Sequence, residues 1–167
     1  MIKLTPERTF RKTPGVHFAD IGVPGSNGID LVEHTGPSVS PPDFHYLHSF
    51  PVRTLPQWYV HQHQIDNNRV VQGERLFELF NPKWNDKHWF VFLTPDSGAL
   101  EIPVGCYHRS YSGKAGSLLL NHAIRDDEYD EKTEFVPRFL PIVDQFPPHF
   151  HGIGFYDAMQ FIEEGEF

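Results

Sequence analysis

Proline and glycine residues interrupt this chain along its whole length. Its 167 residues include 15 prolines and 13 glycines. Proline lacks a backbone donor and breaks a helix interior, and glycine within a helix is destabilising. Their distribution therefore disfavours long helices and favours many short strands joined by turns, as in a sandwich or jelly roll. The sequence predicts an all-β protein.

Runs of β-forming residues locate the strands more closely from residue 58 onward. The expected strands cover residues 58–63, 69–71, 75–80, 88–94, 99–102 and 117–120. Residues 156–162 are expected to form a short helix or a last strand. Residues 1–57 are expected to form short strands and loops that wrap a barrel.

The length of the chain suits one domain with one core. We expect this domain to cover residues 1–167, with its central part at 58–137 and a C-terminal extension at 138–167. The formal net charge is −8, so the surface repels phosphate backbones and anionic lipids. We therefore expect a small-molecule ligand and neither a nucleic acid nor a membrane as partner.

The cysteine content and the N-terminal sequence both favour a cytoplasmic protein. Cys106 is the only cysteine, which excludes an intrachain disulfide and suits a reducing compartment. No apolar run reaches the length of a signal peptide or of a membrane-spanning helix. We expect a cytoplasmic location.

His61 and His63 are separated by a single residue within the first expected strand. Side chains two positions apart on a strand point to the same face of the sheet. On an outward face these histidines would be solvated. If the face lies inside a barrel, both imidazoles enter one cavity.

A further histidine follows a proline–glycine turn some 45 residues after this pair. Pro103, Gly105 and His108 lie in a segment of the form Gly-x4-Pro-x-Gly-x2-His that starts at Gly98. The turn reverses the chain and aims His108 back toward the interior. A His-x-His strand followed by this segment resembles the double signature of the cupin superfamily. The resemblance implies a cupin jelly-roll β-barrel with an irregular N-terminal extension, few short helices and a histidine-lined cavity.

Residues 58–137 also resemble the RmlC-like cupins that act on dTDP-sugars. The segments 69–73 and 100–108 are similar to parts of the dTDP-4-dehydrorhamnose 3,5-epimerases. The 61–63 pair and the segment 127–135 are similar to the dTDP-4-keto-6-deoxyglucose 3,4-ketoisomerases, in which His-x-His is catalytic. The resemblance covers about half of the chain. It implies a deoxysugar-nucleotide isomerase or epimerase that acts on a dTDP-sugar, forms a homodimer and needs no cofactor.

Two positions depart from the epimerase pattern. Asn121 stands where the epimerases carry a tyrosine that acts as an acid. The position of an epimerase lysine falls near Asp66 or Asn67, with only Arg69 as a nearby cation. These differences disfavour an ordinary 3,5-epimerase and favour a ketoisomerase or a relative with another substrate.

The implied chemistry needs a base and a group that stabilises negative charge. A carbonyl acidifies the hydrogens on the neighbouring carbon, and an imidazole can remove such a proton and return it elsewhere. His61 and His63 are the expected catalytic residues. The enolate oxygen needs a donor or a cation, and aromatic rings can stack on a base or a sugar. The expected substrate-binding residues are Trp58, Tyr59, Arg69, Tyr107, His108 and Asn121.

The same sequence features allow two other functions. His61, His63 and His108 could supply three nitrogen ligands to Fe(II), Zn(II), Ni(II) or Mn(II). Metal cupins usually place a glutamate four or five residues after His-x-His, where this chain has the poor ligands Asn67 and Asn68. The other alternative is a cupin that only binds a small molecule or a partner.

The other histidines carry weaker signals. His45 and His48 lie among aromatic residues and are expected to be packing or hydrogen-bonded residues. His149 and His151 repeat the His-x-His spacing. We expect this second pair to belong to a lid or a dimer contact, or to form another metal site if the segment folds toward the cavity.

Overall fold

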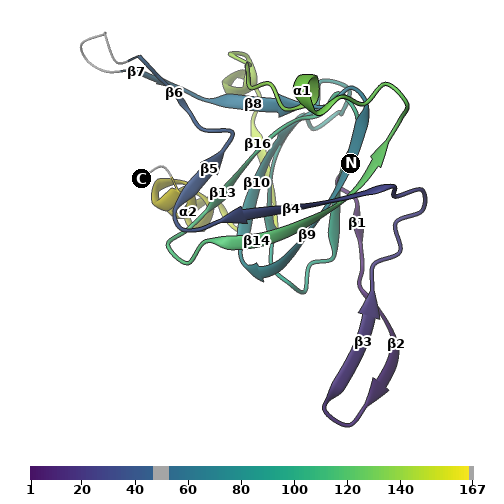
Figure 1. Cartoon of the computed structure of the whole chain (residues 1–167). Helices are drawn as coiled ribbons and strands as arrows, with labels where there is room; N and C mark the ends of the chain where they lie inside the picture. Colours follow the sequence, from purple (N-terminus) through teal and green to yellow (C-terminus); the bar gives the residue numbers. More distant parts are fainter. Residues whose placement is uncertain (47–52, 166–167) are drawn as a thin grey trace.

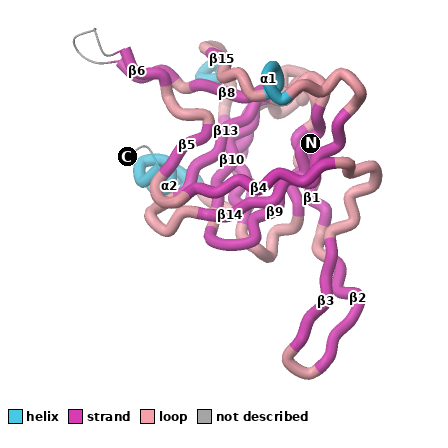
Figure 2. Tube along the Cα trace, viewed as in Figure 1, coloured by secondary structure: helices cyan, strands magenta, loops and turns pink. Residues whose placement is uncertain are grey.

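The computed structural model describes residues 1–46 and 53–165 of the chain. Over these ranges the chain forms a β-barrel of two packed sheets, and the two α-helices lie outside it (Figure 1 and Figure 2). This arrangement confirms the expected all-β, cupin-like fold. None of the described helices is long and apolar enough to cross a membrane. His48 lies outside the described residues.

The first sheet has five antiparallel strands. In spatial order they are β1 (Leu4–Thr5), β12 (Ala99–Ile102), β9 (Gln64–Gly73), β14 (Ser117–Arg125) and β4 (Gly28–His34). Strand β9 lies at the centre and pairs with both β12 and β14. Side chains of β9 at even-numbered positions from Gln64 to Val70 are buried, as expected for the inner face of a barrel.

The second sheet has seven strands. Six follow in the order β15 (Arg138–Phe139), β8 (Gln57–Val60), β13 (Tyr107–Ser112), β10 (Arg75–Phe80), β11 (His88–Leu93) and β16 (Pro148–His151), and β5 (Ser38–Ser40) also pairs with β13. All of its pairings are antiparallel except that of β11 with β16. Along β13, successive side chains alternate between the barrel interior and the outer face, and this alternation defines two separate environments.

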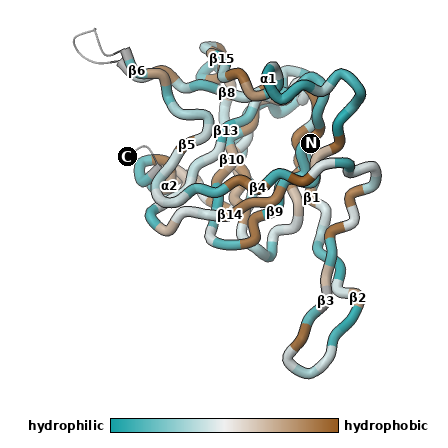
Figure 3. Tube along the Cα trace, viewed as in Figure 1, coloured by the Kyte–Doolittle hydropathy of each residue, from teal (hydrophilic) through white to brown (hydrophobic). Residues whose placement is uncertain are grey.

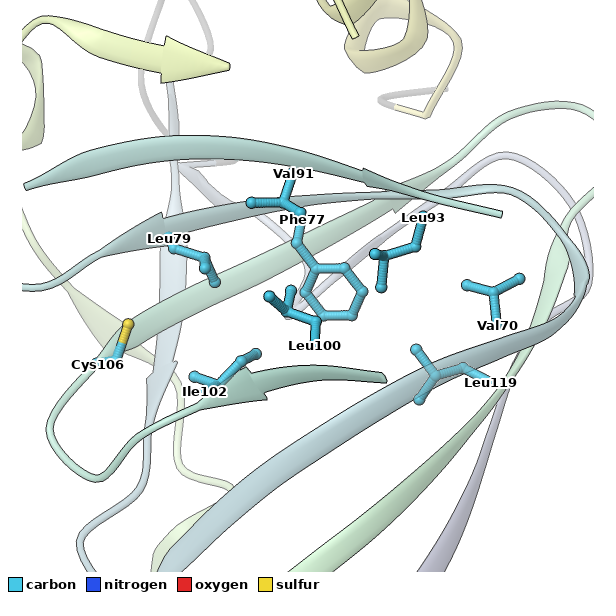
Figure 4. Close-up of a cluster of buried hydrophobic side chains, with 9 residues drawn as sticks. All are labelled: Val70, Phe77, Leu79, Val91, Leu93, Leu100, Ile102, Cys106 and Leu119. Carbon is cyan, nitrogen blue, oxygen red and sulfur yellow. The ribbon is translucent and has the colours of Figure 1, made fainter. Parts of the chain in front are cut away.

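The main core lies between the two sheets. It consists of buried apolar side chains from both, shown in Figure 4: Val70, Phe77, Leu79, Val91, Leu93, Leu100, Ile102, Cys106 and Leu119. Burial of this much apolar surface is the main contribution that holds the sheets together. Burial also raises the pKa of the Cys106 thiol well above its usual value, so the thiol stays protonated and acts as a small apolar group.

The C-terminal extension covers the outer face of the second sheet. It contains the 3₁₀ turn η1 (Val143–Gln145) and the helix α2 (Phe155–Gly165), and the short helix α1 (Glu131–Glu134) precedes it. Apolar residues of α2 pack on Leu76, Phe90 and Tyr111, while Val143 packs on Trp58 and Phe80. Residues 156–162 are therefore helical, which decides between the two forms expected for them.

Two hairpins project from the barrel in Figure 1: β2 (Arg8–Thr13) with β3 (Val16–Asp20), and β6 (Phe44–Tyr46) with β7 (Arg53–Leu55). His45 lies on β6 and is exposed, so of the two roles expected for it, packing or hydrogen bonding, packing is wrong. The expected strand 58–63 is wrong in its last three residues, because β8 ends at Val60 and the chain bends before β9 begins at Gln64. This bend determines where the two histidines of the first motif point.

Candidate active site

A cavity of about 240 Å³ lies between the two sheets. Its lining includes Tyr59, His61, Gln64, Asp66, Asn68, Arg75, Phe77, His108, Ser110, Leu119, Asn121 and Phe135. Phe77 and Leu119 also belong to the core cluster of Figure 4, so the apolar core forms one wall of the cavity. The other walls carry polar and ionisable side chains, which is the usual composition of a small-molecule site.

The proline–glycine turn holds the two sequence motifs together. The backbone N–H of Gly105 donates to the carbonyl of His61 at 2.9 Å, and Gly105 has a φ of 79°, which favours glycine. The strand that follows this turn pairs with β8, so that His108 lies opposite Tyr59. The ring centroids of His61 and His108 are 4.9 Å apart as a result.

Asp66 lies between these two imidazoles. Its Oδ2 atom is 3.4 Å from Nε2 of His61 and 3.5 Å from Nε2 of His108. Its other oxygen, Oδ1, accepts hydrogen bonds from Asn121 at 2.9 Å and from Gln64 at 2.5 Å. The two amides thus orient the carboxylate, and the three ionisable groups form one buried cluster.

Backbone carbonyls determine which nitrogen of each imidazole faces the cavity. Nδ1–H of His61 donates to the carbonyl of Glu134 at 3.0 Å, and Nδ1–H of His108 donates to the carbonyl of Cys106 at 3.1 Å. Because a carbonyl can only accept, both Nδ1 atoms must carry hydrogen. The Nε2 atoms of both rings are thereby directed toward Asp66.

The surroundings move the pKa values of the two histidines in opposite directions. Burial, together with the nearby positive charge of His61, lowers the pKa of His108 to about 4. Burial also opposes protonation of His61, but Asp66 and Glu134 outweigh it and raise the pKa of His61. Burial would raise the pKa of Asp66, yet its contacts with His61 and the charge of His108 lower it to about 2. Near neutral pH, His108 is therefore neutral, Asp66 is ionised, and His61 has the greater tendency to carry a proton.

Glu134 supports the position of His61 from the short helix α1. Its carboxylate accepts hydrogen bonds from the backbone N–H groups of Gln62 at 3.0 Å and His63 at 3.1 Å. Two donors in the bend between β8 and β9 are satisfied in this way. Phe135, the next residue, places its ring 5.1 Å from that of His61 at the partly exposed side of the cavity.

Four of the residues predicted from the sequence line the cavity: Tyr59, His61, His108 and Asn121. Asn121 does not replace the tyrosine acid of the epimerases. Its side chain donates to Asp66 and accepts from the backbone N–H of Asn67 at 2.9 Å. It therefore acts on the position of a neighbouring group.

The structure places His63 outside the cavity. Its Nδ1 atom lies 3.0 Å from Asp126 and its Nε2 atom 3.6 Å from Glu128, on the surface of the molecule. These carboxylates raise its pKa, with the contact to Asp126 as the largest cause. The expected cluster of His61, His63 and His108 is consequently not formed, because the bend after Val60 abolishes the alternation of a strand.

Three other predicted residues face away from the cavity. Arg69 lies on the outer face of β9 and pairs with Glu7. Trp58 and Tyr107 belong to the apolar cluster beneath the C-terminal extension, on the outer face of the second sheet. The prediction that these three side chains line the same site as His61 is therefore wrong, since a shift of one position along a strand reverses the face.

Two functional candidates in the cavity were not expected from the sequence. Asp66 is one, and its signal was the run of polar residues at alternate positions of β9, starting at Gln64. The other is Arg75, a buried cation whose guanidinium donates to Ser117 and to the carbonyl of Val32. Burial lowers the pKa of Arg75 to about 10, and it remains charged at neutral pH.

The second His-x-His pair lies far from this cavity in the fold. His149 and His151 belong to β16, the edge strand next to β11. The His149 ring lies 5.1 Å from that of Trp89, and its Nε2 atom is 3.4 Å from Asp86. The segment is therefore neither a lid over the cavity nor part of a second histidine site there.

No protein-family model and no curated protein sequence matches the chain. Solved structures of dTDP-sugar enzymes do match its fold.

One is QdtA, a sugar 3,4-ketoisomerase from Thermoanaerobacterium thermosaccharolyticum in complex with TDP, at 15% identity over 87% of this chain and 93% of that chain, with a TM-score of 0.59. Another is the WlaRB TDP-quinovose 3,4-ketoisomerase from Campylobacter jejuni, at 16% identity over 81% and 91% of the two chains, with a TM-score of 0.58. A third is the dTDP-6-deoxy-D-glucose-3,5-epimerase RmlC from Legionella pneumophila Philadelphia 1, at 11% identity over 90% and 83%, with a TM-score of 0.55. The fold of this chain is thus that of the RmlC-like cupins.

Proposed function

We propose that this protein is a sugar-nucleotide isomerase or epimerase in which His61 and His108 move a proton next to a keto group. The observation that carries the proposal is the pair of Nε2 atoms that face one buried carboxylate, Asp66. Pairs of titratable groups whose surroundings drive their pKa values apart are typical of acid–base sites. The similar fold of enzymes that act on TDP-sugars supports the same class of substrate.

The proposed roles follow from the protonation states. Neutral His108 has a lone pair on Nε2 and acts as the base that removes a proton from the carbon next to the keto group. Protonated His61 donates through Nε2–H to the developing enolate oxygen. The proton held by His108 then returns to the other carbon of the enediol. His61, now neutral, takes the proton of the hydroxyl that becomes the new carbonyl, so both imidazoles regain their starting states. Asp66 stabilises the positive charge on whichever imidazole carries it.

The size of the cavity suits the reacting part of such a substrate. Ligand pockets commonly have volumes of about 300–1,000 Å³, and this cavity has about 240 Å³. It therefore accommodates the sugar ring rather than the whole nucleotide. Tyr59 and Phe135, whose ring centroids are 6.0 Å apart, lie beside the histidines and offer aromatic surface to the sugar.

The test is hydrogen exchange on a 4-keto-6-deoxy dTDP-sugar in heavy water. The wild-type protein should place deuterium on a carbon next to the carbonyl. His108→Asn and His61→Asn should each lower the rate of exchange by roughly 100-fold or more, the usual scale for loss of a general acid or base. His63→Asn is the matched control, because His63 is only partly buried and lies outside the cavity; it should retain exchange. Wild-type protein without exchange on several such sugars would remove the proposal.

A homodimer is proposed as the functional assembly. The hairpin β2–β3 extends away from the barrel in Figure 1, and Figure 3 shows short hydrophobic stretches on it. Val16, at its tip, is 49% exposed. Light scattering on the full chain should give twice the mass of one chain. A single-chain mass at micromolar concentrations would contradict the proposal.

A metal-dependent cupin is the second candidate, and one observation favours it. One ligand atom each from His61, Asp66 and His108 lies within 4.8 Å of the others, so these residues could hold a divalent ion where three histidines were expected. The residues fit such an ion, because both Nδ1–H groups donate to carbonyls and both Nε2 atoms are available as ligands. The ion would supply Lewis-acid polarisation of a substrate oxygen.

Melting temperatures with and without chelator distinguish the two candidates. A bound ion stabilises only the folded state. For the metal candidate, a chelator should lower the melting temperature by several degrees, and Zn(II) or Ni(II) should restore it. For the acid–base candidate, the melting temperature and the exchange rate should both be indifferent to chelator.

A further inference from the structure

A second cavity lies outside the barrel, beneath the C-terminal extension. It has a volume of about 570 Å³, more than twice that of the cavity between the sheets. Its floor is the outer face of the second sheet, and its roof is formed by residues 139–144 and by one face of α2. Strand β13 separates the two cavities: His108 faces the inner one and Arg109 faces this one.

The floor of the outer cavity contains a buried polar network. Glu78 accepts hydrogen bonds from His88 at 2.8 Å and from the hydroxyl of Tyr111 at 3.0 Å. Arg109 donates through Nη2 to Asp43 at 2.6 Å. Its guanidinium carbon lies 5.1 Å from the ring centre of Tyr111 and 5.7 Å from that of Trp58. Apart from these groups the walls are mainly apolar and aromatic.

One donor of this network has no partner among the described residues. Arg109 is only 1% exposed, yet its Nε–H makes no hydrogen bond. Oε2 of Glu78 is 4.0 Å from Nε, which is too far for a hydrogen bond. An unpaired buried donor is costly and uncommon in a folded protein. A single oxygen atom at hydrogen-bond distance from both Nε and Oε2 would satisfy the donor.

The charges around this position indicate which kind of oxygen fits. The positive charge of Arg109 is already balanced by Asp43 and Glu78, and Asp144 adds another carboxylate to the lining. An anionic ligand would be repelled by these carboxylates. A hydroxyl group can accept from Arg109 and donate to Glu78 at the same time.

We propose that the outer cavity binds an uncharged, mainly apolar ring compound that carries a hydroxyl group. The rings of Trp58, Tyr111 and Phe90 would contact its apolar body, and the hydroxyl would bridge Arg109 and Glu78. This site is separate from the one between the sheets and does not depend on the function proposed for that site.

Calorimetric titration of the full chain with 2-naphthol, 2-methylnaphthalene and 2-naphthoate tests the proposal. The three probes share one ring system and differ in a hydroxyl, a methyl and a carboxylate group. We expect 2-naphthol to bind about tenfold more tightly than 2-methylnaphthalene, the scale of one buried hydrogen bond. 2-Naphthoate should bind more weakly than either.

Two variants localise the binding. Met159→Trp fills the cavity from α2 and should abolish binding of 2-naphthol, whereas Leu31→Trp, at a 65% exposed position of β4, should leave binding unchanged. Arg109→Lys keeps a cation for Asp43 but removes Nε–H, so 2-naphthol and 2-methylnaphthalene should then bind equally. If Arg109→Lys does not fold, titration of the wild type with the three probes and of Met159→Trp with 2-naphthol still tests the proposal.

Several results would overturn the proposal. The first is that no probe binds, as expected if the cavity holds only water. The second is equal binding of 2-naphthol and 2-methylnaphthalene to the wild type. The third is unchanged binding of 2-naphthol to Met159→Trp. Loss of binding in His61→Asn, with retention in Met159→Trp, would place the probe in the barrel instead.

Discussion

A carboxylic acid buried in a protein normally takes up a proton more readily than in water, because burial disfavours the charged form. Asp66 departs from this tendency. Two imidazoles approach one of its oxygens, and the amides of Asn121 and Gln64 donate to the other. The ionised state is therefore favoured, and this charge in turn sets the protonation of the histidines beside it.

Replacement of Asp66 by asparagine should lower the pKa of His61. The substitution removes the carboxylate that holds the proton on His61, while the burial that opposes protonation remains. NMR titration of the imidazole nitrogens would measure the shift. Asp126→Asn is the matched control, because Asp126 contacts His63 and not His61. This substitution should lower the pKa of His63 and leave the pKa of His61 unchanged. An unchanged pKa of His61 in Asp66→Asn would contradict the role of Asp66 in holding the proton on His61.

The rate of the proposed exchange reaction should show an unusual dependence on pH. The base, His108, has a pKa of about 4, so the acid limb should lie well below the ordinary histidine value of 6.5. The acid, His61, has a raised pKa, so the rate should fall on the alkaline side above 6.5. A pH profile of kcat/KM in heavy water would measure both limbs. An acid limb at 6.5 would instead assign the role of base to a histidine with an unshifted pKa.

At the scale of secondary structure, the bend between β8 and β9 depends on the helix α1. Neither Gln62 nor His63 has a strand partner for its backbone N–H, and both donate to the buried carboxylate of Glu134. The backbone carbonyl of Glu134 also accepts a hydrogen bond from Nδ1–H of His61. A four-residue helix thus stabilises the segment that carries the first motif.

Glu134→Ala should lower the free energy of unfolding by about 1–3 kcal/mol, the cost of buried donors left without acceptors. Exchange activity should fall as well, because the position of His61 is no longer supported. Urea denaturation measures the first effect. Glu131→Ala is the control on the same helix, since Glu131 is exposed, and its unfolding curve should match that of the wild type. Equal stability of Glu134→Ala and the wild type would mean that water replaces the carboxylate without cost.

At the scale of the whole molecule, histidines that burial keeps neutral make the folded protein less stable in acid. Burial, with the charge of Arg75, lowers the pKa of His34 to about 4, and burial lowers that of His108 to about 4. The unfolded chain binds these protons near pH 6.5, whereas the folded protein binds them only near pH 4. Their contribution to stability is therefore complete above pH 6.5 and decreases as the pH falls toward 4. His61 acts in the opposite sense, because its pKa is raised in the folded protein.

His34→Gln should make the loss of stability between pH 6.5 and pH 4 smaller than in the wild type. The glutamine amide can still hydrogen bond to Ser112, which His34 contacts at 2.7 Å, but it does not titrate. Urea denaturation at several pH values in this range would measure the slope. His63→Gln should differ from the wild type in another range: the pKa of His63 is raised in the folded protein, so its stabilising contribution is present below pH 6.5 and is lost as the pH rises above 6.5. The same slope in His34→Gln and the wild type would show that His34 does not titrate as its burial implies.

The local pattern of residues was sufficient to predict the class of the fold and most of the strands. Prolines and glycines act on the backbone where they stand, and the alternation of apolar residues is a property of each strand, so these signals need no tertiary contact. The same holds for the turn at Gly105, whose positive φ returns the chain toward His61. On this basis His61 and His108 could be assigned to one cavity.

Only the tertiary structure decided which other side chains share that cavity. His63 and Trp58 are one or two residues from cavity residues, yet one faces solvent and the other faces the C-terminal extension. The bend that separates His63 from His61 is held by Glu134, which lies 72 positions from Gln62 in the sequence. Asp66 became part of the site through Asn121, 55 positions away, and through the approach of two histidines, one from the bend after β8 and one from β13. Contacts between residues so distant in the chain have no local signature, because they depend on how the two sheets pack.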